Sequence, residues 1–174
     1  LAKSLRLIAR DGAKAFYEGE IAQKIAAEMK AHDGLITLDD LRAYRAAERV
    51  PVRGDYRGYQ IVSMPPPSSG GVHIVQMLNM LEHFPLREQG HNSAATLHQM
   101  SEIMKRAYAD RAEYLGDPDH VKVPVTALTE KAYIKQLVNG ISATRATASD
   151  SLSVPVPEKA ESYNTTVANS IITT

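Results

Sequence analysis

The sequence contains no cysteine among its 174 residues. This absence excludes disulfides, thiolate catalysis and cysteine-ligated metal sites, but it does not locate the protein, because an oxidising compartment permits disulfides without requiring them. No apolar stretch approaches the ~20 residues that a membrane-spanning helix needs. Basic and acidic residues balance at 20 each, and the net charge of +0 removes the usual electrostatic case for nucleic acid or an anionic membrane as partner.

Several common catalytic signatures are also missing. There is no Gly-x-Ser-x-Gly elbow, no Walker loop, no His-Glu-x-x-His and no Gly-x-Gly-x-x-Gly. The first residues carry neither an initiator Met nor a signal-peptide pattern, so a mature protein and an excised fragment are equally compatible with this start. The hydrophobic content of 44% is ordinary for a globular protein and argues against wholesale disorder.

Hydrophobic spacing predicts helices in the first third of the chain. Apolar residues recur at helical spacing, and residues 11–12 and 33–34, both Asp-Gly, interrupt the pattern. Thr37 stands where a helix cap is expected, and a short helix through Leu41 and Tyr44 should follow it.

The pattern changes to two short strands, at about residues 50–52 and 59–63. Residues 65–71 hold three prolines, two serines and two glycines, and are predicted to be neither helix nor central strand.

Three more helices are predicted after this loop: from about residue 72 to 82, from Asn92 or Ser93 to Tyr114, and from a Thr129 cap to Val138, with Gly140 past its end. The first has an apolar face that we expect to point inward, formed by Ile74, Met77, Leu78 and Leu81. The second carries its apolar residues on one face: Leu97, Met100, Met104, Ala107 and Tyr108.

Three groups of side chains could carry chemistry in this region. His98 and Glu102 lie four apart on a predicted helix, so they are either a poor metal-ligand pair or, as we expect, a solvated helix face. Residues 117–120, with two aspartates and a histidine, are interpreted as a turn rather than a metal cluster. Ser68 and Ser69 are interpreted as a rigid connector into a helix rather than as nucleophiles, because no adjacent base is visible.

Residues 142–164 are rich in Ser, Thr, Ala and Pro and lack periodicity, so we expect a long exposed loop. It leads to Asn164-Thr165-Thr166 and then to a strand-like stretch, residues 167–174. The tripeptide leaves three interpretations open: an N-glycosylation pattern, a β-rich loop, or a self-processing junction. In self-processing, a threonine hydroxyl attacks the preceding carbonyl. The freed α-amino group, with an unperturbed pKa of ~7.7–8.0, then serves as a general base.

Motifs along nearly the whole chain resemble those of the γ-glutamyltransferase family. The matching segments, in the family's order, are residues 11–19, 34–41 with Tyr44, 51–59, 63–71, 107–111, 114–118 and Glu161-Ser162 before Thr165-Thr166. Together they make the resemblance specific.

The resemblance implies an α+β fold, the predominantly helical part of an N-terminal-nucleophile hydrolase αββα sandwich, with a few short strands. Residues 1–164 would be the C-terminal part of the large subunit, and residues 165–174 the start of the small subunit. Autocatalytic cleavage would separate Asn164 from Thr165. Thr165 would then be the catalytic nucleophile that cleaves γ-glutamyl amides such as glutathione through an acyl-enzyme and passes the acyl group to water or to an amino-acid or peptide acceptor.

The resemblance gives no catalytic role to Thr166 or to residues 68–71, and it implies no metal and no organic cofactor. Its partners would be the γ-glutamyl substrates, the acceptors and the remainder of the two subunits. Bacterial members are typically periplasmic or secreted, and we expect the same location here.

The chain departs from the family after Thr166. The family usually continues with a His and two strands, whereas here residues 167–170 look like the later strand with about ten residues missing, through a deletion or an omitted stretch. The family's supporting Thr and Asn do not match at Ile172 and Thr174, and we transfer neither.

Other parts of the family's active site fall outside the sequence. The family's carboxylate-binding arginine would precede Leu1, and its acidic α-amino ligand and oxyanion glycines would follow Thr174. The substrate-binding residues therefore remain unassigned. Oxyanion donors are typically worth ~10²–10³ in turnover, so the chain alone is expected to be inactive. The alternative hypothesis is a non-catalytic helical interaction domain derived from the family. The apolar face from Leu97 to Tyr108 would normally pack on the missing parts, and if exposed it would bind another chain or aggregate.

Overall fold

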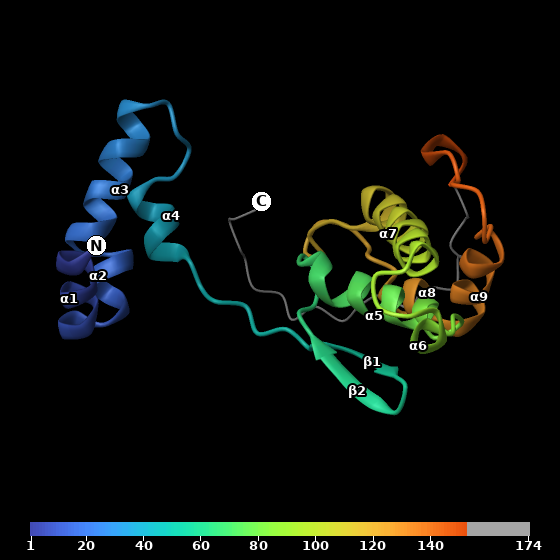
Figure 1. The fold of residues 1–174 in the computed structure, drawn as a ribbon. Helices are drawn as coiled ribbons and strands as arrows, with labels where there is room; N and C mark the ends of the chain where they lie inside the picture. Colours follow the sequence, from blue (N-terminus) through green and yellow to red (C-terminus); the bar gives the residue numbers. More distant parts are fainter. Residues whose placement is uncertain (153–174) are drawn as a thin grey trace. The chain divides into compact units, whose positions relative to one another are not determined.

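The computed structural model of the chain describes residues 1–152. These residues form two compact units, one from Leu1 to Glu48 and one that begins at Arg49 (Figure 1). The two strands of the described residues both lie in the second unit. None of the helices in residues 1–152 has the length and apolar character to cross a membrane.

The first unit consists of four helices: α1 (Ala2–Asp11), α2 (Ala13–Tyr17), α3 (Glu20–Ala31) and α4 (Leu38–Ala43). The interruptions predicted at residues 11–12 and 33–34 are confirmed. Gly12 separates α1 from α2 with φ 63°, a backbone conformation that residues with a Cβ rarely adopt. The predicted cap of α4 is also confirmed, because Thr37 Oγ1 accepts from the Asp40 amide at 3.2 Å while the Asp40 carboxylate accepts from the Thr37 amide at 2.8 Å.

The second unit begins with an antiparallel hairpin of β1 (Val52–Tyr56) and β2 (Tyr59–Ser63). Its register pairs Val52 with Ser63 and Tyr56 with Tyr59, so a two-residue turn joins the strands. Both turn residues have positive φ, 47° at Arg57 and 86° at Gly58, as tight hairpin turns require. The first strand runs from Val52 to Tyr56 and shares only Val52 with the strand predicted at about residues 50–52. Pro51 directly before it has no N–H for the ladder.

Helix α5 (Ser69–Leu81) is the centre of the second unit. It packs against β1, β2 and three helices, and the remaining elements are α6 (Leu86–Gln89), α7 (Ala94–Tyr114), α8 (Val125–Thr129), α9 (Lys131–Asn139) and a 3-10 turn (Ser149–Ser151). The core contains side chains from most of these elements: Val52, Val72, Val75, Met80, Ile103, Ala107, Val123, Leu128, Tyr133, Ile134 and Leu137.

The buried face of α5 agrees only in part with the predicted one. Met77 and Leu81 are partly buried and pack against the core, but Ile74 is 43% exposed. The fully buried positions are others, among them Val72, Val75 and the polar Gln76. The helix also starts at Ser69, before the predicted start at about residue 72. The physical reason is that α5 has neighbours on several sides, so its buried surface includes polar positions and is not the plain apolar stripe that periodicity detects.

The apolar face predicted for α7 is exposed in the described residues except for Ala107, which is buried. The other four predicted residues form an exposed apolar stripe along the helix: Leu97, Met100, Met104 and Tyr108. The side of α7 that packs inward is largely polar and includes Glu102, Arg106 and Asp110. These polar groups can be buried because hydrogen-bond partners satisfy them. Hydrophobic spacing in the sequence carries no information about such partners.

Thr129 does not cap α9. It is the last residue of α8, and its hydroxyl donates to the Val125 carbonyl at 2.9 Å instead. Helix α9 follows directly after Glu130 without a side-chain cap, and it ends before Gly140 as predicted. From Ser142 to Leu152 the chain has no helix or strand apart from the 3-10 turn, and residues 153–164 of the predicted loop lie outside the described part.

Candidate functional site

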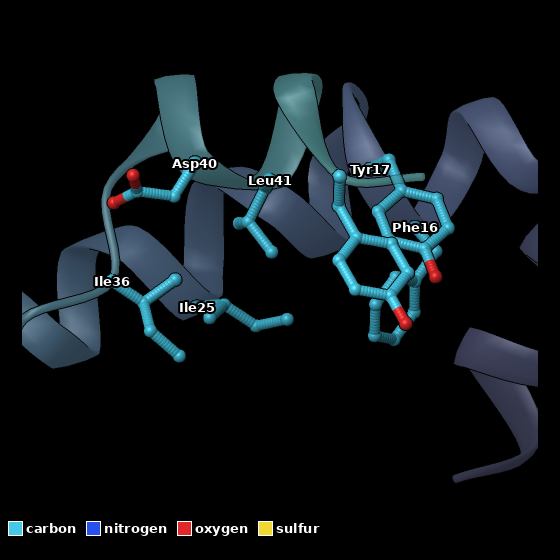
Figure 2. Close-up of a pocket in the computed structure, with 7 residues that line it drawn as sticks. Phe16, Tyr17, Ile25, Ile36, Asp40 and Leu41 are labelled. Atoms are coloured by element: carbon cyan, nitrogen blue, oxygen red, sulfur yellow. The ribbon is translucent and has the colours of Figure 1, made fainter. Parts of the chain in front are cut away.

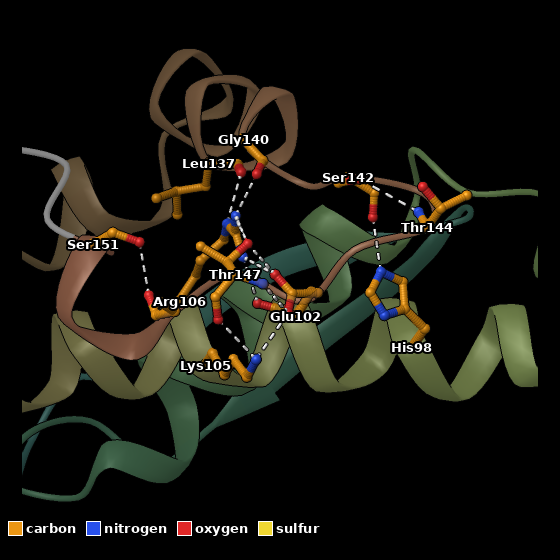
Figure 3. A network of polar contacts seen from close by, with 11 residues as sticks. His98, Glu102, Lys105, Arg106, Leu137, Gly140, Ser142, Thr144, Thr147 and Ser151 are labelled. Atoms are coloured by element: carbon orange, nitrogen blue, oxygen red, sulfur yellow. Dashed lines mark hydrogen bonds and ion pairs between the residues drawn. The ribbon is translucent and has the colours of Figure 1, made fainter.

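The predicted nucleophile Thr165 and its neighbour Asn164 lie outside the described residues, as does the strand predicted at residues 167–174. The structure describes the segment that leads toward them in the sequence, from the end of α9 to Leu152. Figure 3 shows this segment lying along α7, which holds it through a network of polar contacts.

Glu102 on α7 is at the centre of this network. Its side chain is only 1% exposed, and both carboxylate oxygens accept hydrogen bonds. Oε1 accepts from Lys105 Nζ at 2.9 Å and from the Thr147 amide at 3.1 Å. Oε2 accepts from Arg106 Nη1 at 2.8 Å and from the Thr147 hydroxyl at 2.5 Å. Charge-assisted bonds of this kind are the strong ones in proteins, so Glu102 holds Thr147 to the helix.

Arg106 extends the same network to the end of α9. Its side chain is 5% exposed, and its Nε donates to the Leu137 carbonyl at 3.0 Å. Nη2 donates to the Gly140 carbonyl at 2.6 Å and to the Thr147 hydroxyl at 3.2 Å. A planar guanidinium can serve several acceptors at once, and here it satisfies two carbonyls at a helix C-terminus.

The pKa of Glu102 reflects this environment. Burial alone would raise the pKa, but hydrogen bonds from Thr147, Lys105 and Arg106 outweigh it and lower the pKa to about 2. A carboxyl whose pKa is depressed in the folded state contributes stability above its unfolded pKa of ~4.3, and this contribution is lost as the pH falls toward the folded value.

We therefore expect the Glu102→Gln substitution to destabilise the protein at neutral pH by an amount that shrinks as the pH falls from about 4 to about 2. The measurement is urea unfolding of both proteins over a pH series. Glu113→Gln, at an exposed position of the same helix, is the matched control. A stability difference between wild type and Glu102→Gln that stayed constant over this range would contradict the assignment.

The two possible metal clusters have other roles. His98 Nε2 lies 2.7 Å from the Ser142 carbonyl, and Glu102 is buried in the network, so the expectation of a solvated helix face is wrong for Glu102. Residues 117–120 form the predicted turn, closed by the Asp119 amide on the Asp117 carboxylate, and Asp119 pairs with Arg49 at 2.6 Å. Within residues 1–152 no three His, Asp or Glu side chains are grouped so that they could bind a metal ion.

The serines of the Gly-rich loop have a structural role. Ser68 is the N-cap of α5, and its hydroxyl accepts from the Gly70 amide at 3.2 Å. In the first turn of α5, Gly71 lies so close to the residue after β2 that an added Cβ would stand 1.9 Å from the Met64 carbonyl oxygen. The loop therefore fixes the start of α5 against the hairpin, as the connector interpretation requires.

A second polar cluster, buried in the core, links α5, α7 and α9. Asp110 accepts from Gln76 Nε2 and, at 2.8 Å, from the Tyr133 hydroxyl. His73 Nδ1 lies 2.8 Å from Gln76 Oε1 and must donate to it, while His73 Nε2 is buried with no hydrogen-bond partner among the described residues. Burial raises the pKa of Asp110, although both hydrogen bonds oppose this effect, and burial lowers the pKa of His73. Because its members join three core helices, we interpret this cluster as structural.

A pocket of about 300 Å³ lies in the first unit (Figure 2). Its lining is mainly apolar or aromatic: Phe16, Tyr17, Ile25, Ile36, Leu41 and Tyr44, with Asp40 at one end. Tyr17 stacks on Tyr44 at a centroid distance of 5.5 Å. The Asp40 carboxylate already accepts from Thr37, and ligand sites normally need a few polar groups to orient the ligand. We assign no ligand to this pocket.

The chain is similar to known proteins that are several times longer. A family model described as gamma-glutamyltranspeptidase matches residues 1–173. The glutathione hydrolase proenzyme of Escherichia coli (strain K12) is 58% identical over 146 residues, which are 84% of this chain and 25% of that protein. The Acylase ACY 1 proenzyme of Pseudomonas sp. (strain V22) is 48% identical over 132 residues, 76% of this chain and 24% of that protein. The chain thus spans about a quarter of the length of these curated relatives.

The same family is found among solved structures. Helicobacter pylori gamma-glutamyltranspeptidase matches with a TM-score of 0.84 and 43% sequence identity, over 94% of this chain and 47% of that chain. The predicted fold class, α+β with mostly helices and a few short strands, is confirmed by this match and by the described elements. The family model covers nearly the whole chain and the relatives are closely similar, so the chain belongs to the γ-glutamyltranspeptidase family.

Proposed function

We propose that this chain is part of a glutathione hydrolase precursor that cleaves itself between Asn164 and Thr165 and then uses Thr165 as its nucleophile. The observation that carries the proposal is the family match through residue 173, which extends past both residues. The 58% identity to a protein named glutathione hydrolase proenzyme supports both the substrate class and the existence of a precursor.

The chemistry follows from the position of the threonine. In maturation, the Thr165 hydroxyl attacks the Asn164 carbonyl and the peptide nitrogen leaves as the amine of Thr165, which gives an ester between the two residues. Water then cleaves the ester and leaves a carboxylate on Asn164 and a free hydroxyl and α-amino group on Thr165. An α-amino group has a pKa of ~7.7–8.0, so it can take a proton near neutral pH.

In turnover, the same hydroxyl attacks the γ-glutamyl carbonyl of glutathione or a related amide. The proton from the hydroxyl passes through the α-amino group to the leaving amine, and a γ-glutamyl ester of Thr165 remains. Water resolves this ester in the hydrolase reaction, and an amino-acid or peptide amine resolves it in the transferase reaction. The groups that bind substrate belong to the remainder of the large and small subunits. A periplasmic or secreted location remains a prediction from the family resemblance.

Two other functions have an observation in their favour. The 48% identity to Acylase ACY 1 proenzyme suits an acylase that shares the threonine chemistry but takes a different acyl group. The exposed stripe of Leu97, Met100, Met104 and Tyr108 suits a non-catalytic interaction domain, although in the proposed enzyme the same stripe would pack on the rest of the protein. The higher identity to the glutathione hydrolase favours the first proposal.

The proposal is tested by the turnover of a γ-glutamyl anilide by the full-length protein. We expect wild type to be active, Thr165→Ala to lose all measurable turnover, and Thr166→Ala, which keeps the hydroxyl at position 165, to retain it. The comparison substrate is the anilide of a simple acyl group, which lacks the α-amino and α-carboxylate groups of glutamate. An acylase would prefer this substrate. Undiminished turnover in Thr165→Ala would remove Thr165 from its role.

A further inference from the structure

We propose that Glu102, Lys105 and Arg106, named here the Thr147 clamp, position the segment before the cleavage junction and thereby set the rate of precursor self-cleavage. The inference rests on the proposed function, since it assumes a cut before Thr165. It adds positioning residues that lie on α7, outside the junction itself.

The clamp binds every polar atom of Thr147. The Thr147 amide and hydroxyl both donate to Glu102, the hydroxyl also accepts from Arg106, and the carbonyl accepts from Lys105 Nζ at 3.0 Å (Figure 3). A hydroxyl that donates to a carboxylate and accepts from a guanidinium at the same time can come only from Thr or Ser at this position. The contact is therefore specific for one residue of the loop.

The loop on both sides of Thr147 is exposed as far as Leu152, which is 8% exposed. Residues 143–146 and 148–151 are exposed, so this stretch buries little apolar surface that could hold it in place. Three charged side chains, two of them almost fully buried, are committed to one half-buried threonine. A buried ion pair is weak evidence for stability, because desolvation offsets most of its attraction, but it can fix one arrangement of the chain.

Helix α7 makes the clamp rigid. Ile103 and Ala107, on the same helix, are buried in the core, so the clamp side chains project from a fixed base. Two more contacts join the loop to this helix: His98 Nε2 lies within hydrogen-bond distance of the Ser142 carbonyl, and Arg106 donates to the Gly140 carbonyl. From the end of α9 to Thr147 the chain is thus held along α7. The residues that follow Thr147 in the sequence lead to the junction.

Self-cleavage depends on such placement. The Thr165 hydroxyl must stand roughly 3–3.5 Å from the Asn164 carbonyl carbon, and a misplacement of about 1 Å can cost about 10²-fold in rate. If the chain before the junction is held at Thr147, the precursor samples fewer unreactive conformations. Loss of the clamp should slow cleavage without changing the chemistry of Thr165.

The test is the first-order rate of cleavage of the full-length precursor, followed by intact mass after synthesis or refolding, in wild type, Thr147→Val, Thr147→Ser and Thr144→Val. We expect Thr147→Val to cleave at least about tenfold more slowly, because it lacks the hydroxyl. Thr147→Ser should cleave near the wild-type rate. Thr144→Val, the same change at an exposed position of the same loop, should also match wild type. Mature Thr147→Val enzyme should show wild-type kcat and KM.

The outcomes separate this inference from the proposed function. If neither the wild type nor any variant is cut before Thr165, the proposed function is wrong. Normal wild-type cleavage with an equal rate in Thr147→Val overturns the clamp alone. The stability of each variant is measured in a Thr165→Ala background. A slow rate explained by unfolding of Thr147→Val at the assay temperature would also overturn the positioning role.

Discussion

The Gly71→Ala substitution is expected to destabilise the second unit by about 3 kcal/mol or more, since overpacking a tight contact costs this much when the neighbours cannot move. The added Cβ would stand 1.9 Å from the Met64 carbonyl oxygen and 3.2 Å from Val52 Cβ. The closer obstacle is the backbone of Met64, directly after β2, so a rotamer change cannot relieve the clash. Helix α5 would have to move away from the hairpin, and α5 is the centre of the core.

The neighbouring glycine provides a matched control for this prediction. A Cβ at Gly70 would meet only the Ser68 hydroxyl, at 3.4 Å, which is ordinary contact. Alanine is favoured over glycine in helices by roughly 1 kcal/mol, so Gly70→Ala should be neutral or stabilising. Urea or thermal unfolding of the two variants measures the difference. Equal stabilities would show that α5 does not pack on β2 as described.

The second large effect is expected from Arg106→Met, which should lower the free energy of unfolding by about 3–5 kcal/mol, the usual result of removing one partner from a buried ion pair. The substitution leaves the 1%-exposed Glu102 carboxylate without its closest cation. It also removes the donor to the Leu137 and Gly140 carbonyls at the end of α9. A methionine replaces the aliphatic part of the side chain but supplies no donor.

Lys105→Met is the matched control for Arg106→Met. Lys105 also pairs with Glu102, at 2.9 Å, but its side chain is 33% exposed. A partly solvated lysine can be replaced at a cost of about 1 kcal/mol or less, because water already screens the pair. Similar losses in the two variants, measured by urea unfolding at neutral pH, would mean that burial of Arg106 does not matter.

Local signals predicted most of the elements. Thr37 and Ser93 stand where the structure has caps, and β2 occupies the predicted residues 59–63. These features depend on a few neighbouring residues, so the sequence contains the necessary information. The first strand was predicted less well, because residues 53–55, Arg-Gly-Asp, are not typical strand residues. The buried faces of α5 and α7 could not be predicted in the same way, because they depend on which distant elements surround each helix.

The candidate site shows the same limit. Glu102 and Arg106 are four residues apart, a spacing also typical of exposed helix pairs, and Thr147 lies in a stretch full of Ser and Thr. The only signal was a cluster of charged residues, Glu102 to Arg106, between apolar residues of the helix. Its partner Thr147 is far away in the sequence. Thr165 was predicted through the family resemblance, since its tripeptide alone left three interpretations open.

The central claim is that Thr165 becomes a chain terminus, and the most direct measurement is the intact mass and N-terminal sequence of the purified full-length protein. We predict two fragments, one ending at Asn164 and one beginning with Thr165, and a single uncut chain in Thr165→Ala. An active protein that stays in one piece, or that is cut elsewhere, would contradict the claim.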